Sequence, residues 1–138
     1  ALLRSIWKKY KFDENLTGLE DLDVAKKILA AGYKLSYEPD ARVFHIHQEM
    51  FRQIRNRFER ESLALQKIMP EVHINFFDLI ILVSSSVISD IIALDKKQFR
   101  TIVSIIAYRC LQYYGSYRGN HISRALSKKA KYVYFYPK

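Results

Sequence analysis

Carboxylates and histidines are concentrated in one stretch of the chain, residues 18–47. Its first part holds Glu20, Asp21 and Asp23, and its last part holds His45 and His47. A positioned carboxylate can accept a proton from a reacting hydroxyl group, and imidazole nitrogens can bind a metal ion. The stretch therefore contains the residue types needed for general-base chemistry next to a metal.

A helix is expected to carry the three acids. Apolar residues recur at helical spacing from Leu19 onward, and Gly32 supplies a left-handed stop. Asn15 or Thr17 is expected to cap this helix. Acids in the first turn are favoured by the free N–H groups and by the positive end of the helix dipole. Helix-terminal charge alone is therefore the structural alternative to a catalytic role.

Two short strands are expected to follow the helix. Leu35 and Tyr37 alternate with polar residues, Pro39 turns the chain, and residues 43–47 alternate again. Side chains two positions apart on a strand point to the same face, so His45 and His47 would lie side by side. This spacing suits a metal site, although two hydrogen-bonded structural histidines are the alternative.

Several short motifs in this region occur in a fixed order. They are Phe12-Asp13-Glu14, Gly18-Leu19-Glu20-Asp21-Leu22-Asp23, Gly32-Tyr33, Tyr37-Glu38-Pro39 and Val43-Phe44-His45. In this order they resemble the C-terminal part of the catalytic domain of family 2 glycosyltransferases. The resemblance implies an α/β fold, the C-terminal portion of a Rossmann-like GT-A domain. It also implies an enzyme that transfers a sugar from a nucleotide-sugar donor to a hydroxyl acceptor with inversion.

The resemblance also implies roles for individual residues. Asp21 would be the general base, and Glu20 would position the loop or the acceptor. Asp23 would contact donor or acceptor. A divalent cation, Mg²⁺ or Mn²⁺, would be held mainly by an Asp-x-Asp motif, joined by His45 and with His47 as a further candidate ligand.

A second helix, over residues 49–69, is predicted by an apolar stripe with interleaved arginines. Arg55 and Arg57 are candidates for binding the donor pyrophosphate, because a guanidinium matches phosphate oxygens. Surface ion pairs are the favoured alternative for both. Processive family members carry Gln-x-x-Arg-Trp after the histidine region. Here the arginine is one place late and Phe58 replaces Trp, which argues against processive synthesis.

The family's nucleotide-binding half has no counterpart in these 138 residues. The expected organisation is residues 1–48 as the acceptor-side part of the catalytic domain and residues 49–138 as a basic, mainly helical region. Sugar transfer would serve the synthesis of cell-surface polysaccharide or glycolipid, with a glycan or lipid-linked acceptor. The chain by itself is expected to be inactive.

Two further apolar helices are predicted over residues 76–94 and 99–114, with a turn or loop at 115–120. The first has an uncharged core of only residues 79–89, shorter than the ~18 residues of a spanning helix. It suits either a core helix or a helix lying in a membrane interface. Ser84, Ser85 and Ser86 are expected to divide it.

The excess of positive charge lies at the end of the chain. The net charge is +9, and residues 95–138 hold 10 Lys and Arg against one acid. A basic, tyrosine-rich end suits an anionic membrane, which predicts a cytoplasmic location at the inner face of the cell membrane and peripheral contact with it. The alternative function is a non-catalytic basic module that binds an anionic membrane or polymer. Nucleic acid is not expected as a partner, and the single cysteine, Cys110, excludes a disulfide framework within the chain.

Overall fold

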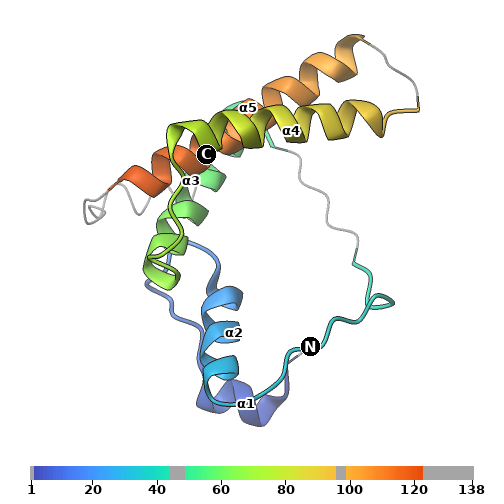
Figure 1. The fold of residues 1–138 in the computed structure, drawn as a ribbon. Helices are drawn as coiled ribbons and strands as arrows, with labels where there is room; N and C mark the ends of the chain where they lie inside the picture. Colours follow the sequence, from blue (N-terminus) through green and yellow to red (C-terminus); the bar gives the residue numbers. More distant parts are fainter. Residues whose placement is uncertain (1, 44–48, 96–98, 123–138) are drawn as a thin grey trace.

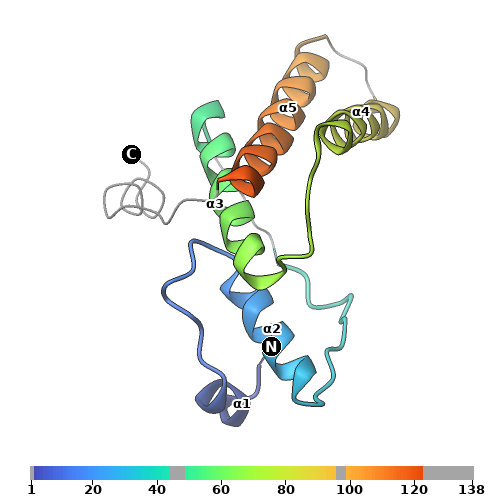
Figure 2. The ribbon, with the colours of Figure 1, turned by 60° about the vertical axis from the view of Figure 1, so that its left-hand side comes forward.

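The computed structural model describes residues 2–43, 49–95 and 99–122. These residues form helices α1 (Arg4–Lys9), α2 (Glu20–Ala30), α3 (Phe51–Ile68), α4 (Phe76–Ile92) and α5 (Phe99–His121). Helices α1 and α2 lie at one end of the molecule, and α4 and α5 lie at the other (Figure 1). Helix α5 is placed between α3 and α4 (Figure 2).

Helices α3 and α5 make the closest helix contact because glycines allow their backbones to approach. A Cβ atom on Gly115 would lie 2.5 Å from the carbonyl oxygen of Arg55, and one on Gly119 would lie 2.3 Å from that of Glu59. Glu59 is buried at this crossing, and its Oε1 lies 3.5 Å from Arg118 Nη2. Any side chain at either glycine would therefore push the two helices apart.

Asn120 links the end of α5 to the connection between α3 and α4 by hydrogen bonds. Its Oδ1 accepts a hydrogen bond from Ile74 N and its Nδ2 donates to the Val72 oxygen, each at 3.0 Å. The Gln66 side chain donates to the Asn120 carbonyl. Asn120 is buried, so its bonds replace those that water would otherwise make with these polar groups.

Helix α4 begins at a reciprocal cap in which Asn75 Oδ1 accepts from Asp78 N and Asp78 Oδ2 accepts from Asn75 N. Polar side chains then join it to α5. Arg109 donates from Nε and Nη2 to the two carboxylate oxygens of Asp90, at 2.7 and 2.9 Å. One turn away, the Ser86 hydroxyl lies 2.6 Å from the Tyr113 hydroxyl. These contacts are made on one side of α4.

The small apolar core of the described residues comprises Leu16, Val24 and Ile28 in the segment containing α2, and Ile54, Leu63, Ala64 and Ile68 in α3. Two long-range hydrogen bonds join these parts. Thr17 Oγ1 donates to the Arg60 carbonyl at 2.8 Å, and Lys26 donates to the Ile68 carbonyl. Helix α2 is thereby held near the C-terminal half of α3.

The expected α/β class, with a Rossmann-like GT-A domain, is wrong for the described part of the chain, which is helical and contains no strand. A strand needs a neighbouring strand to satisfy its backbone groups. No described segment pairs with residues 34–38, and the exposed fractions of Leu35 and Tyr37 are 54% and 89%. The two-residue alternation therefore marks an exposed connection. Residues 44–48 of the second expected strand lie outside the described residues.

The expected turn at residues 115–120 is also wrong, because α5 continues unbroken to His121. The two glycines that suggest a turn are the residues that face α3. The three consecutive serines do not divide α4 either. Ser85 Oγ donates back to the Leu82 carbonyl and Ser86 bonds to Tyr113, so two of the hydroxyls are satisfied without breaking the helix.

Candidate functional site

The acidic motif forms the first turn of α2, as its position before an amphipathic segment predicts. Leu19 precedes the helix in the left-handed conformation, with φ of 59°, and no side chain caps the helix start. Glu20, Asp21 and Asp23 all lie in the first turn. Their carboxylates are therefore next to the uncapped N–H groups and the positive end of the helix dipole.

The three acids differ in what surrounds them. Asp23 Oδ2 lies 2.6 Å from Lys27 Nζ, one helical turn away. Glu20 is half-buried. Asp21 is exposed, and its Oδ1 accepts a hydrogen bond of 2.9 Å from its neighbour Leu22 N. Asp21 is thus the most accessible of the three carboxylates and the one best placed to meet a hydroxyl from solution.

The approach to this turn is anchored on α3. Thr17 is buried and bonded to Arg60, while a Cβ on Gly18 would make an ordinary contact with Glu61. Earlier in the connection, Asp13 Oδ1 accepts from Asn15 N at 2.9 Å and from Asn15 Nδ2 at 3.1 Å. These bonds, the backbone one first, lower the pKa of Asp13 below its ordinary value. Asp13, Asn15 and Thr17 therefore have fixed partners in the connection before Glu20.

The structure does not join Arg55 and Arg57 to the acidic turn. Arg57 Nη1 lies 3.2 Å from Glu49 Oε2, and its Nη2 donates to the Tyr108 hydroxyl of α5 at 3.3 Å. Arg55 Nη2 donates to Asn56 Oδ1 at 3.2 Å. Their bonds hold the start of α3 and its contact with α5. This arrangement matches the ion-pair alternative for Arg57, and a phosphate-binding role for either residue stays a prediction.

The expected metal ligands His45 and His47 lie outside the described residues. Within residues 2–43, 49–95 and 99–122, no three His, Cys, Asp or Glu side chains are gathered as a metal site. The divalent cation therefore stays a prediction.

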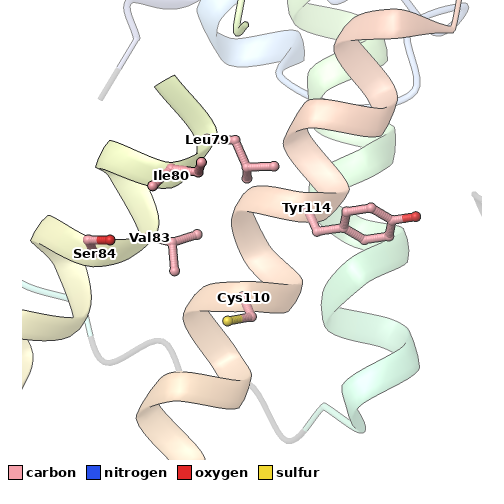
Figure 3. Close-up of a pocket in the computed structure, with 6 residues that line it drawn as sticks. All are labelled: Leu79, Ile80, Val83, Ser84, Cys110 and Tyr114. Carbon is pink, nitrogen blue, oxygen red and sulfur yellow. The ribbon is translucent and has the colours of Figure 1, made fainter. Parts of the chain in front are cut away.

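A groove between α4 and α5 is the feature that sequence analysis missed. It has a volume of 390 Å³ and is lined by Leu79, Ile80, Val83, Ser84, Cys110 and Tyr114. Leu79 and Val83 extend from α4 toward α5, and the sulfur of Cys110 points from α5 toward α4 (Figure 3). The lining is almost entirely apolar, so the groove suits a hydrocarbon group and offers little to a charged one.

Comparisons with known proteins give no family for this chain. No family model, no curated protein and no solved structure matches it. Of the helices in the described ranges, none combines the length and the apolar character needed to cross a bilayer.

Proposed function

We propose that this chain supplies the acceptor-side residues of an inverting glycosyltransferase. The observation that carries the proposal is Asp21, an exposed carboxylate within the ordered motif Gly18-Leu19-Glu20-Asp21-Leu22-Asp23. The motif resembles that of family 2 glycosyltransferases, and its helical placement leaves this carboxylate open to an incoming hydroxyl. The proposal rests on the motif and this accessibility, and it does not require a sheet in the described residues.

In the proposed reaction, the oxygen of the acceptor hydroxyl attacks the anomeric carbon of a nucleotide sugar. The Asp21 carboxylate takes the hydroxyl proton as the new carbon–oxygen bond forms. The bond from the anomeric carbon to the phosphate oxygen breaks, and the nucleoside diphosphate leaves with the electron pair. One displacement of this kind inverts the configuration at the anomeric carbon.

The neighbouring acids support this step in different ways. Asp23 is held by Lys27, so its carboxylate is less available as a base. Glu20 is half-buried next to the anchored residues Thr17 and Gly18, which suits a positioning role. The acceptor would be a glycan or a lipid-linked sugar, and transfer would take place at the inner face of the cell membrane.

The proposal is tested with the protein produced from its complete gene. A panel of nucleotide sugars is offered with Mg²⁺, with Mn²⁺ and with a chelator, and released nucleoside diphosphate is measured. The expected result is turnover of one donor class that stops with the chelator, with a product whose anomeric configuration is inverted by NMR. A product with retained configuration, or no turnover with any donor, would overturn the proposal.

A further inference from the structure

Helix α4 has one face that is apolar and uncovered. All six of its exposed large side chains fall on this face when the residues are placed at the 100° per residue of an α-helix. They are Phe76, Phe77, Ile80, Ile81, Ile88 and Ile92. The exposed fractions of Phe77 and Ile92 are 74% and 73%. The exposed Ser84 lies on the same face between Ile81 and Ile88, so the face is apolar apart from this hydroxyl. Exposed apolar surface of this kind marks a site of interaction.

The two carboxylates of α4 are engaged elsewhere and leave this face uncharged. Asp78 closes the cap with Asn75 at the start of the helix. Asp90 is bound by Arg109 on the side toward α5. The helix is thus divided into a side bonded to α5 and a side without any ionic group, as in helices that lie in the plane of a membrane interface.

Helix α5 extends the same surface. Its exposed residues Phe99, Val103 and Ile106 recur at spacings of four and three, and Cys110 continues the stripe. Cys110 and Ile80 both line the groove between the helices, so the groove joins the stripe of α5 to the apolar face of α4 (Figure 3). The apolar surface is therefore shared by two helices that are locked together by the Asp90–Arg109 pair.

The charge of this part of the chain indicates its occupant. Helix α5 contains no acid, and Arg100 is exposed next to Phe99, whereas Arg109 and Arg118 are paired with Asp90 and Glu59. Residues 95–138 of the sequence hold 10 basic residues against one acid. An apolar face on a segment whose sequence is strongly basic complements a bilayer with anionic headgroups, since apolar side chains enter the acyl boundary while Lys and Arg meet the phosphates.

We propose that α4 and α5 together form a docking face for an anionic lipid bilayer, with α4 lying along the membrane surface and acyl chains entering the groove between Leu79 and Cys110. The inference stands on exposure, charge and the groove, and it is independent of the proposed sugar transfer. Its test can therefore succeed or fail without any donor or acceptor being known.

The first test is flotation of the full protein with lipid vesicles. Binding is expected to vesicles of phosphatidylethanolamine with phosphatidylglycerol, and to fall about tenfold or more on vesicles of phosphatidylcholine alone. Ile81→Asp places a charge on the exposed face and is expected to lower binding to the anionic vesicles about tenfold. Val43→Asp, at an exposed position far along the chain from α4, changes the net charge equally and is the matched control.

Both variants are expected to keep the helix content of the wild type, because the replaced side chains are exposed. Circular dichroism measures this helix content. If Ile81→Asp and Val43→Asp reduce vesicle binding equally, the change in net charge alone explains the loss. That result would overturn the assignment of the α4 face as the docking surface. Absence of flotation would overturn the proposal outright. Concentration-dependent dimerisation that Ile81→Asp abolishes, without vesicle binding, would assign the face to a second copy of the chain instead.

The second test uses Cys110, the single cysteine of the sequence, which is exposed in the groove. A polarity-sensitive fluorophore attached to its sulfur is expected to shift to shorter wavelength when anionic vesicles are added. Nitroxide groups on the lipid acyl chains are expected to quench it. If the labelled protein binds to vesicles with neither a shift of the emission wavelength nor quenching by the nitroxide lipids, that result would overturn the placement of acyl chains in the groove.

Discussion

At the scale of single residues, the structure separates groups that look alike in the sequence. Glu20, Asp21 and Asp23 are three acids within four positions, yet one is half-buried, one is exposed and one is ion paired to Lys27. The two glycines of α5 also differ from Gly18 in the space around them. Gly115 and Gly119 are required by close backbone approach, whereas Gly18 has room for a methyl group.

Gly119→Ala tests the backbone contact between α3 and α5. The added Cβ would lie 2.3 Å from the Glu59 carbonyl oxygen and 2.8 Å from Ser62 Cβ, so the helices must separate. Alanine gains about 1 kcal/mol of helix propensity over glycine, which offsets part of this loss. The free energy of unfolding, measured by urea denaturation, is expected to fall by about 1–3 kcal/mol.

Gly18→Ala is the matched control for that measurement, since its Cβ would lie 3.5 Å from Glu61 Cγ, an ordinary contact. Its effect on the free energy of unfolding is expected to stay within about 0.5 kcal/mol. Equal stability of Gly119→Ala and wild type would contradict the close crossing of α3 and α5.

At the scale of elements, the bond between α4 and α5 is predicted to depend on pH. Hydrogen bonds from Arg109 lower the pKa of Asp90 below its ordinary value of 3.8. Because the pKa is depressed in the folded state, the stabilisation is present above the ordinary pKa and is lost as pH falls through the lower, folded-state pKa. Protonation of Asp90 at pH values below its lowered pKa therefore weakens the contact between the helices.

Asp90→Asn isolates this effect. The variant is expected to unfold more easily than wild type above the ordinary pKa of Asp90, and the difference is expected to shrink as pH falls below 3.8. Denaturant titrations of both proteins across the acidic range provide the measurement. A difference in unfolding free energy that stays constant down the whole acidic range would rule out the ionised Asp90–Arg109 pair as its source.

Helix positions were largely predictable from the sequence, whereas contacts between helices were not. The stripe that includes Ile54 and Phe58 predicts residues 49–69 as a helix, and α3 (Phe51–Ile68) confirms it. The turn expected at Gly115 and Gly119 was wrong because a glycine that breaks a helix and one that faces another helix have the same local sequence signal. Only the tertiary contact with α3 distinguishes them.

The candidate site was predictable to a similar degree. Spacing placed the acids at the start of a helix that ends near Gly32, and α2 confirms that placement, with Gly32 in the left-handed conformation at φ of 84°. Leu35 and Tyr37 were misread as a strand because alternation does not reveal whether a pairing partner exists. The exposure of Phe77 and Ile81 on α4 could not be predicted, since burial depends on neighbours that periodicity does not specify.

At the scale of the whole molecule, the two proposed sites lie at opposite ends of the structure. The acidic turn of α2 and the apolar face of α4 are separated by α3 and its crossing with α5 (Figure 1). A bilayer bound at α4 and α5 would leave the Asp21 carboxylate away from the docking face. The two proposals therefore concern separate parts of the molecule and can be tested separately.

The most direct test of the central claim compares sugar transfer by wild type, Asp21→Asn and Asp40→Asn, each made from the complete gene. Asp40 is an exposed acid outside the proposed site, so its replacement controls for the loss of one charge. The account predicts a loss of about 10²–10⁴-fold in kcat for Asp21→Asn, the usual range for a general base, with helix content unchanged and Asp40→Asn equal to wild type. Transfer by Asp21→Asn at the wild-type rate would contradict the account.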